Sequence, residues 1–587
     1  MTVTQPATRT VLLGAYAARS CPVKTQNAYD STIALPSAAP DLAGDAAGPG
    51  LAGAGLWDGA ARFTAQVLDE LINVCRGRVV DLRLLAYEGQ DAETRACLQA
   101  LSTGAEVVIG ARLPPDRDGH RVGRPDVLVR GTDAPDGRPG YHPVVVKWHK
   151  ILDRSHRPPE EEPASVWCST LAGPAPDQAA ELAEHGLRLG RREADFTQLA
   201  HYHRMLQAAG YAAGQPLAAV IGSDGLFASP VLAWVDLSVP VIRTFSRSQP
   251  EGWRLRSPLE RYDHEHGFRV DIATVASQQT GDPEHDPGLL VRPVVNGECV
   301  RCPWWEHCRT RLDPDDVSLR IDKGALDRRE ITTLRNRGIV TIQDLVGTDL
   351  DQLLPSYLPE VSHRGGAEPR LRVAVRRARM LLDDVDFHRE TTGPAELPTA
   401  DVEIDFDIES SADGRIYLWG FLVDAGTGSG VYHEFSRFDD LDARAETTLA
   451  LEAFGWLRDL IQTAKSVTIY HYSGYEVARI SELAQRETHE LLDWAAAYAA
   501  AEFLDLLETV KTHYFGVNGL GLKLIARHAG FRWRDDDPGG LNSQHWFAEA
   551  VHSEDADVRA QARTRVLEYN EDDVLATHHL RAWLRAQ

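Results

Sequence analysis

The sequence lacks the features that mark a membrane protein or a secreted, disulfide-stabilised protein. Its 587 residues contain no run of about twenty apolar residues, so we expect no membrane span. Seven cysteines are too few for a disulfide scaffold in a chain of this length. The first residues show no charged segment followed by an apolar one, so we expect no secretory signal. These absences together predict a cytoplasmic protein.

The sequence also lacks an excess of positive charge. Asp and Glu outnumber Lys and Arg by 86 to 62, which gives a formal net charge of −24. This argues against a protein that coats nucleic acid over its whole surface, although a basic groove inside an acidic molecule stays open. The composition is otherwise globular, with 43% hydrophobic and 25% charged residues. At the usual domain size, the length predicts about three or four domains.

Hydrophobic periodicity predicts an α/β multidomain chain. In the first half we expect a flexible loop at 31–56, an irregular segment at 154–178, helices at 57–75, 91–103 and 193–210, and strands at 105–112, 123–130 and 141–150. In the second half we expect short helices at 318–355, a basic helix at 369–385 and a linker at 391–399. Strands follow at 401–408, 415–423 and 430–436, then a helix at 446–464, a strand at 466–471, and helices after that strand to the end.

The strand predicted at 401–408 begins a segment with acidic residues at every second position. Asp405, Asp407 and Glu409 would share one face, because side chains alternate along a strand. Three carboxylates side by side repel one another, and a bound cation is the usual remedy. An edge strand with a solvated acidic face is the alternative.

Two further segments carry acids near predicted element ends. Glu476 follows the strand at 466–471 and would begin a helix, where an acid also interacts favourably with the helix dipole. Tyr569 and Asp573 are four residues apart and share one helix face. A solvated acidic helix is the alternative for this pair.

Taken together, Asp407-x-Glu409, Glu476 and Tyr569-x3-Asp573 resemble the DEDD exonucleases with a tyrosine in the third motif, an RNase H-like family. The resemblance implies a 3′–5′ exonuclease that holds two Mg²⁺ or Mn²⁺ ions on Asp407, Glu409 and Asp573, with Glu476 in support and Tyr569 orienting the attacking water. Glu476 stands where the family has Asp, and Asp505 is a second acid that could contribute. The segment before the last helices contains Lys523, which could contact a phosphate or be an ordinary surface lysine.

Four cysteines are spaced like metal ligands. Cys299, Cys302 and Cys308 form a C-x2-C-x5-C cluster, and Cys21 stands near the start of the chain. Four thiolates suit either a tetrahedral zinc ion or a [4Fe–4S] cluster, and the spacing does not decide between them. Either centre would hold both ends of one domain together.

This cysteine arrangement resembles the iron–sulfur RecB-like nucleases of the AddB and CRISPR-adaptation type, which carry a restriction-endonuclease-like PD-(D/E)xK core. The resemblance implies that Asp126 is a metal ligand, Lys147 the catalytic lysine, and Gln198 and Tyr202 residues along the DNA path. Val145 occupies the position of the acid in the D/E-x-K motif, and valine cannot bind a metal. We therefore expect a weakened or inactive nuclease that still binds DNA, unless His149 substitutes as a ligand.

The expected domains are a RecB-like domain at 1–312, a helical connector at 313–395 and an RNase H-like exonuclease domain at 396–587. Residues 331–346 resemble a helix–hairpin–helix element, which exposes main-chain N–H groups to a phosphate, although a plain helical spacer fits equally. The basic helix that follows adds support for a DNA path.

These patterns predict a metal-dependent nuclease acting on single-stranded or frayed DNA in repair, recombination or defence. The alternatives are a DNA-binding scaffold or helicase partner without catalytic activity, and an RNA exonuclease. The chain contains no G-x4-GK[ST] motif, so any helicase motor would be a separate protein.

Overall fold

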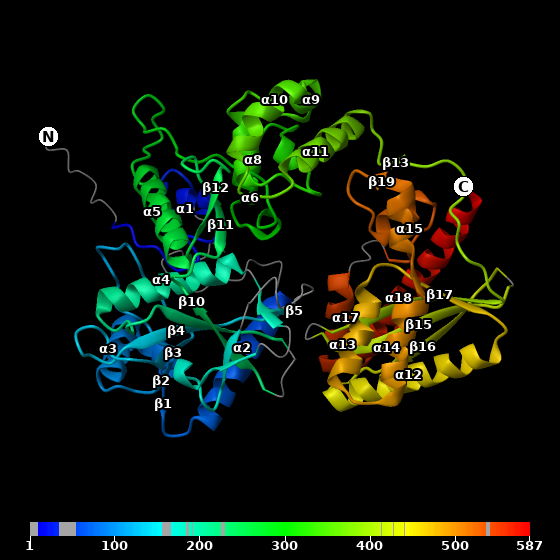
Figure 1. Ribbon diagram of the computed structural model, residues 1–587, viewed down its shortest axis with the longest axis horizontal. Coiled ribbons are helices and arrows are strands. Elements are labelled where there is room, and N and C mark those ends of the chain that lie inside the picture. The colour runs from blue at the N-terminus through cyan, green and yellow to red at the C-terminus, as the bar shows by residue number, and fades with distance from the viewer. Residues whose placement is uncertain are drawn as a thin grey trace. The chain divides into compact units, whose positions relative to one another are not determined.

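The computed structural model describes residues 10–34, 54–154, 166–182, 187–190, 192–224, 229–411, 414–426, 428–439, 441–535 and 540–587. The chain forms two compact units (Figure 1). Unit 1 comprises residues 1–320 and 324–375, and unit 2 comprises residues 321–323 and 376–587. Most of the loop predicted at 31–56 lies outside the described residues. None of the described helices is long and apolar enough to cross a membrane.

Unit 1 is built on a mixed eight-stranded sheet in the order β1-β2-β3-β4-β9-β10-β6-β7. Its strands are β1 (Val79–Asp81), β2 (Val107–Ile109), β3 (Val127–Arg130), β4 (Tyr141–Val146), β6 (Trp167–Thr170), β7 (Ala180–Glu181), β9 (Leu217–Ile221) and β10 (Val231–Asp236). β4 pairs with β3 in antiparallel and with β9 in parallel orientation. The two central strands, β4 and β9, end in β-branched residues and are buried on both faces, as expected of strands covered by helices on either side.

Helices cover both faces of this sheet. α2 (Ala54–Val74) packs on the face to which Val144 and Val146 point. α3 (Gln90–Ser102) and α4 (Glu193–Ala209) pack on the opposite face, where Val145 is fully buried. The helices predicted at 57–75, 91–103 and 193–210 are therefore confirmed within one to three residues at each end.

Two predictions for unit 1 need correction. Residues 154–178 are not wholly irregular, because β6 pairs with β10 inside the sheet. β6 has only four residues and proline-rich flanks, so its sequence shows no recognisable strand pattern. Its pairing partner, β10, lies about sixty residues further along the chain. The strand predicted at 105–112 is shorter, because only β2 at its centre pairs with neighbours.

The remaining elements of unit 1 are helical or form small ribbons. Its remaining helices and strands are α1 (Pro22–Tyr29), α5 (Pro258–Ala276), α6 (Trp305–Arg309), α7 (Val317–Arg320), α8 (Arg328–Arg335), α9 (Ile342–Gly347), α10 (Leu350–Tyr357), β5 (Leu152–Arg154), β8 (Leu187–Leu189), β11 (Ile242–Phe245) and β12 (Trp253–Arg256). α8 and α9 flank a turn that contains Gly338 in a left-handed conformation, φ 79°. α11 (Ala367–Leu382), the predicted basic helix, begins in unit 1, and its residues from Arg376 onward belong to unit 2.

Unit 2 contains a five-stranded sheet in the order β16-β15-β14-β17-β18. The strands are β14 (Val402–Ser410), β15 (Ile416–Asp424), β16 (Val431–Ser436), β17 (Val467–His471) and β18 (Phe503–Asp505). A two-stranded ribbon, β13 (Phe387–Arg389) with β19 (Tyr514–Gly516), lies outside this sheet. β14 pairs with β15 in antiparallel and with β17 in parallel orientation, which places the acidic strand at the centre.

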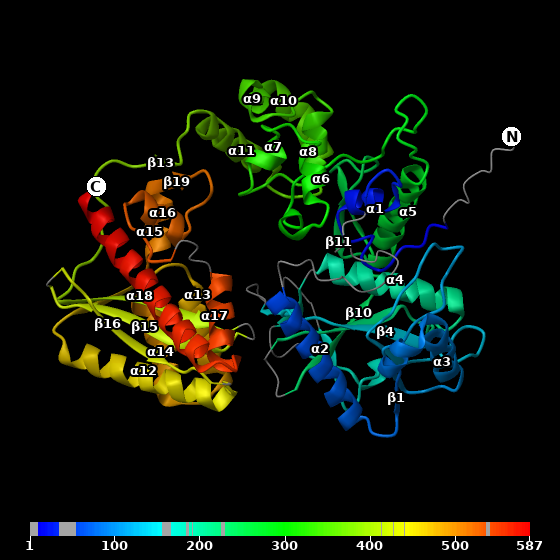
Figure 2. The same ribbon diagram turned by 180° about the vertical axis from the view of Figure 1, so that it is seen from behind.

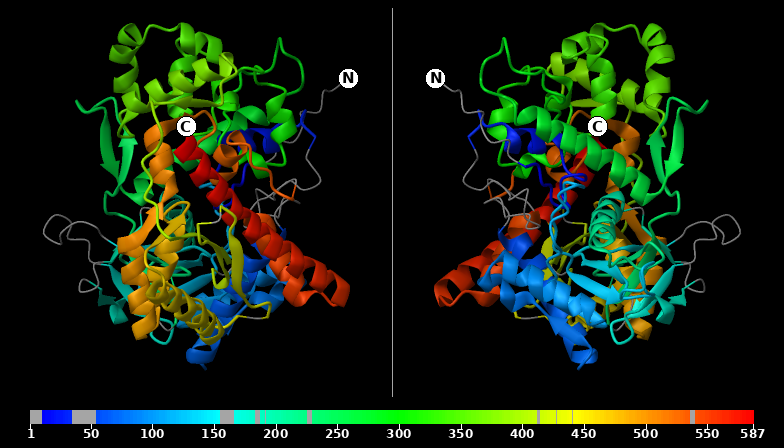
Figure 3. Two further views of the ribbon diagram at one scale, coloured as in Figure 1. Left: turned by 90° about the vertical axis from the view of Figure 1, so that its right-hand side faces the viewer. Right: turned by 90° about the vertical axis from the view of Figure 1, so that its left-hand side faces the viewer.

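The two faces of the unit 2 sheet carry different residues. Ile404, Phe406 and Ile408 pack against α12 (Ala443–Thr463) and the helices after it, α13 (Tyr475–Arg486) and α14 (Glu490–Glu502). The acidic face of β14 is covered by the long C-terminal helix α18 (Ala556–Ala586), drawn in red in Figure 2. The other helices of the unit are α15 (Leu506–His513), α16 (Leu522–His528) and α17 (Gly540–His552). Figure 3 shows the same elements from the sides.

Candidate metal centre and active site

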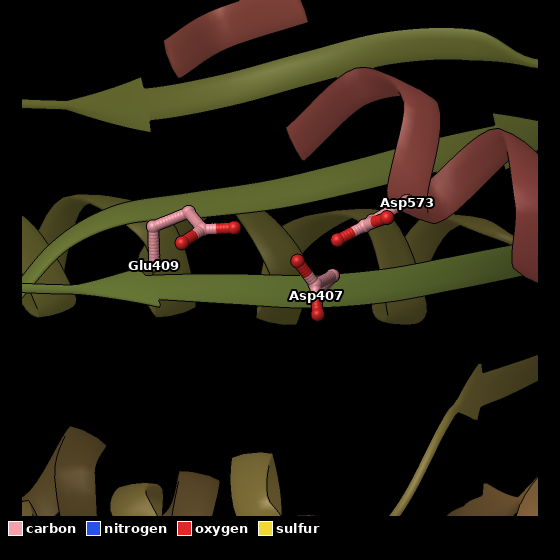
Figure 4. A group of neighbouring side chains, drawn as sticks. All are labelled: Asp407, Glu409 and Asp573. Carbon is pink, nitrogen blue, oxygen red and sulfur yellow. The ribbon is translucent and has the colours of Figure 1, made fainter. Parts of the chain in front are cut away.

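Three carboxylates of unit 2 meet between β14 and α18. Asp407 and Glu409 extend from the same face of β14, and Asp573 extends toward them from α18 (Figure 4). One oxygen atom from each lies within 4.8 Å of the others, and among the described residues no other group of three His, Cys, Asp or Glu ligands is this close. The alternation of a strand and one helix face thus brings together residues that are about 165 positions apart in the sequence.

Each of the three carboxylates is oriented by a neutral donor. Asn570 Nδ2 donates to Asp407 at 2.8 Å, Ser543 Oγ to Glu409 at 2.6 Å and Trp533 Nε1 to Asp573 at 2.7 Å. Asn570 and Ser543 are completely buried. A fixed carboxylate loses little conformational freedom when it binds a cation, so these donors prepare the group for metal binding.

Position 420 requires glycine, because the side chain of Asn570 occupies the space that a Cβ atom would need. Gly420 pairs with Asp407 across the sheet, and a Cβ there would lie 1.8 Å from Asn570 Oδ1. Tyr432 donates to that same oxygen at 2.8 Å. The amide of Asn570 is therefore fixed on both sides, with its nitrogen directed at Asp407.

Tyr569 and Lys523 stand beside the carboxylates. Lys523 Nζ lies 3.5 Å from Asp573 and 4.5 Å from the centre of the Tyr569 ring, and it donates to the Tyr569 hydroxyl. Tyr569 is 4% exposed, and burial together with the neighbouring carboxylates raises its pKa, so its hydroxyl keeps its proton at neutral pH. Lys523, which the sequence left open between a phosphate contact and a surface residue, lies in the site.

Glu476 lies close to the three carboxylates but not among them. It is buried and lies 3.2 Å from His471, and its charge acts on Asp407 and Glu409. Asp505 caps α15, and its Oδ1 accepts the N–H groups of both Leu507 and Ser473. Its contribution to the metal site stays a prediction.

Asp405, the third acid on the β14 face, is neutralised by the protein itself. Its carboxylate accepts from Arg581 at 2.8 Å and lies 3.1 Å from His578. Asp405 and Arg581 are both buried, and such a pair needs this close matching because of its desolvation cost. Of the three acids on this face of β14, only Asp405 forms a close ion pair with an arginine in the described part of the chain. Asp407 and Glu409 have no cationic partner of this kind among the described residues.

The three carboxylates are suited to bind a hard divalent cation, because a cation would relieve their mutual repulsion. Burial and the neighbouring acids raise the pKa of Asp407 well above its ordinary value, and burial raises that of Asp573. Burial and Asp573 raise the pKa of Glu409 to about 8. Oxygen ligands of this kind suit Mg²⁺ or Mn²⁺. The donor set thus matches the predicted metal.

The raised pKa values predict a pH-dependent effect of metal on stability. A carboxyl group whose pKa is higher in the folded than in the unfolded state stabilises the fold below pH 4.5, and this contribution is lost as pH rises through about 8. Without metal, we expect the melting temperature of unit 2 to fall over this range. Mn²⁺ should raise it more at pH 8 than at pH 6, because protons compete with the metal.

Differential scanning fluorimetry in EDTA and in Mn²⁺ measures this effect. Glu409→Gln is the matched control, because glutamine cannot titrate and should reduce the pH dependence. An equal Mn²⁺-induced shift at pH 6 and pH 8 would contradict the predicted competition.

Comparison with known families agrees with this geometry. Residues 404–585 match the family model of the RNase_H superfamily. The match begins in β14 and ends in α18, so it spans all three carboxylates and covers less than half of the chain. No curated protein and no solved structure matches the chain. Unit 2 therefore contains an RNase H-like domain, a fold that indicates a nuclease-type phosphodiester hydrolase using divalent metals.

Unit 1 brings its four predicted cysteine ligands around one pocket. Cys21, Cys299, Cys302 and Cys308 all line it. Asn27 Nδ2 donates to the sulfur of Cys308 at 3.6 Å, and the N–H of Asn296 to that of Cys299 at 3.4 Å. The other three cysteines, Cys75, Cys97 and Cys168, are buried elsewhere.

The predicted N-terminal nuclease residues also lie near one another, but they are engaged by the protein. Lys147 Nζ donates to Gln198 at 2.6 Å and lies 4.0 Å from Asp195. Asp126 accepts the N–H of Val146 at 2.8 Å. The side chain of Val145 points into the hydrophobic core. An acidic residue at this position would place its carboxylate in that core and disrupt it.

Asp195 was missed by the sequence analysis. It is 2% exposed and accepts from His149 at 2.9 Å, so His149 is engaged by this acid. Asp195 stands three residues before Gln198 on α4, a spacing that could have placed it on the same helix face. Gln198 and Tyr202 are buried, with Gln198 donating to the Tyr202 hydroxyl at 3.2 Å. Their contact with nucleic acid stays a prediction.

Proposed function

We propose that unit 2 is a metal-dependent exonuclease that hydrolyses single-stranded or frayed DNA from its 3′ end. The observation that carries the proposal is the close group of Asp407, Glu409 and Asp573, with Tyr569 and Lys523 beside it in a domain that matches the RNase_H superfamily. The order of the acidic motifs along the chain supports the 3′–5′ direction through the DEDD resemblance.

Asp407, Glu409 and Asp573 would hold one or two Mg²⁺ or Mn²⁺ ions, with Glu476 in support. Bound ions lower the pKa of water and offset the charge of the leaving oxygen. The protein's own residues do the positioning. Asn570, Ser543 and Trp533 fix the carboxylates.

The Tyr569 hydroxyl, held by Lys523, orients the attacking water. The water oxygen bonds to phosphorus and loses a proton, the bond to the 3′ oxygen breaks, and that oxygen takes up a proton. The product is a nucleoside 5′-monophosphate. The Lys523 ammonium would lie against the phosphate and offset its charge.

We propose that unit 1 is a restriction-endonuclease-like domain that binds DNA and does not cleave it. Support comes from Val145 in the core and from the engagement of Lys147 and His149 by Gln198 and Asp195. A separate helicase would supply single strands to unit 2.

We propose further that the four cysteines of unit 1 hold a [4Fe–4S] cluster. Four zinc-bound thiolates would stand about 3.8 Å apart, given Zn–S bonds of about 2.3 Å. No three of these sulfur atoms lie within 4.8 Å of one another, since the only such group of ligands in the described part of the chain is the carboxylate group of unit 2. The wider spacing favours a cluster.

End-labelled oligonucleotides test the nuclease proposal. With Mn²⁺, a 3′-labelled single strand should release its label as a mononucleotide at once, whereas a 5′-labelled strand should give a descending ladder. EDTA should abolish both. Release of the 5′ label first would contradict the direction, and an RNA strand cleaved faster than DNA of the same sequence would favour the RNA exonuclease.

A further inference from the structure

A cleft in unit 2 opens directly beside Asp407 and Asp573. Among the described residues that line it, these two metal-site acids are the only carboxylates, whereas Arg377, Lys511 and Lys523 contribute positive charge. This composition is unusual for a chain with a formal net charge of −24. A concave surface with this charge favours an anion that also reaches the carboxylate group.

The three cations of the cleft differ in the contacts they already make. Lys523 is next to Asp573. Lys511 lies on α15 and forms only an exposed pair with Glu508, a contact that contributes little and exchanges readily. Arg377 donates through Nη1 to the carbonyl of Lys323, and its Nε is buried without a hydrogen-bond partner among the described residues.

Gly521 leaves space in the wall of the cleft. Its φ of −63° is open to any residue, and a Cβ there would meet no atom within 4 Å. Neither backbone conformation nor packing therefore requires glycine. The loop that carries it is anchored, because Tyr472 donates to the carbonyl of Leu520 and β19 pairs with β13. The space at Gly521 is thus part of a fixed wall.

The same wall carries apolar side chains. Leu522, Leu524 and Phe515 line the cleft, and Leu524 is 37% exposed. The guanidinium of Arg376 lies 4.0 Å from the centre of the Phe515 ring, which holds this aromatic side chain in place. Apolar and aromatic walls contact unpaired bases, whereas a duplex keeps its bases stacked inside and presents mainly phosphates.

From these observations we infer that the cleft is the binding path of a single polynucleotide strand, with Arg377 and Lys511 holding backbone phosphates upstream of the cleaved bond. Lys523 faces the phosphate nearest the carboxylates. The bases lie against the wall formed by Phe515, Leu522 and Leu524, and the space at Gly521 admits the chain. This inference rests on the proposed nuclease function of unit 2, and it names the substrate class and the residues that select it.

Two variants of the full chain test the inference: the double variant Arg377→Ala/Lys511→Ala, and Gly521→Trp. The control is Arg444→Ala/Lys465→Ala, which removes two exposed cations of unit 2 outside the cleft lining. Binding of a fluorescent single strand is measured by anisotropy in Ca²⁺. Hydrolysis is measured in Mn²⁺ on that strand and on bis(p-nitrophenyl) phosphate, which is too small to span the cleft.

We expect the double variant to bind the strand about tenfold more weakly, with a salt dependence lower by about two phosphate contacts. Gly521→Trp should lower kcat/KM for the strand by a similar factor. The control should match wild type on both the strand and the small diester. A blunt duplex should bind more weakly than the single strand.

Unchanged strand binding in both variants would overturn the inference, as would a duplex bound as tightly as the single strand. A wild-type protein that hydrolyses neither substrate in Mn²⁺ would refute the proposed function instead, and the anisotropy data would still decide whether the cleft binds the strand.

Discussion

Replacing Glu409 with glutamine is expected to lower the rate of phosphodiester hydrolysis by about a thousandfold while leaving strand binding in Ca²⁺ little changed. Glutamine keeps the size of the side chain and can still accept the hydrogen bond from Ser543, so the fold is preserved. It loses the negative charge that would bind the cation. Metal-ion catalysis contributes several kcal/mol, and about 4 kcal/mol corresponds to a factor of a thousand.

The control for this variant is Glu434→Gln on the neighbouring strand β16. Glu434 is exposed and belongs to the same sheet, but it is not one of the three grouped carboxylates. It should keep the wild-type rate. Initial rates on a 3′-labelled single strand over a range of Mn²⁺ concentrations measure both variants. A Glu409→Gln protein that regains the full rate at high Mn²⁺ would show that Glu409 tunes affinity and is not required for the reaction.

If the four cysteines hold the proposed [4Fe–4S] cluster, replacing Cys302 with serine is expected to abolish cluster binding and to lower the melting temperature of unit 1 strongly. Cys21 precedes the cluster Cys299, Cys302 and Cys308 by about 280 residues within unit 1, so the centre would close a loop of that length. Structural metal sites supply on the order of 10 kcal/mol of folding free energy. Absorbance near 400 nm and iron content should disappear together with the stability.

Cys168→Ala is the matched control, because Cys168 is buried away from the pocket. Hydrolysis of bis(p-nitrophenyl) phosphate by unit 2 should persist in Cys302→Ser, since the carboxylates belong to the other unit. If the wild-type protein is colourless and contains one zinc ion, the four cysteines form a zinc site and the proposed cluster is wrong. A wild-type protein that binds neither metal would refute the metal centre.

The alternation along β14 and the four-residue spacing in α18 placed three acids on one strand face and Tyr569 and Asp573 on one helix face, and the DEDD resemblance implied that the two faces meet. Both are local periodicities, so the sequence displays them directly. The partners of those acids were not predictable in this way. Arg581 neutralises Asp405 from 176 positions away, and Trp533 and Ser543 (on α17) reach their carboxylates from 40 positions before Asp573 and 134 positions after Glu409, respectively.

The same distinction explains the errors in unit 1. The valine at position 145 is visible in the sequence, but the burial that makes it a core residue follows from α4 packing on β4. Asp195 was missed because its role depends on His149, which approaches it from another element. The short strand β6 depends on pairing with β10, a contact over about sixty residues. Non-local pairing of this kind leaves little trace in a local pattern.

The most direct test of the account compares two variants of the full chain, Glu409→Gln and Lys147→Ala, for release of a 3′ label from single-stranded DNA at saturating substrate in Mn²⁺. If the carboxylate group of unit 2 is the catalytic site, Glu409→Gln loses the activity and Lys147→Ala keeps the wild-type kcat. Loss of activity in Lys147→Ala with a normal rate in Glu409→Gln would contradict the account and assign catalysis to unit 1.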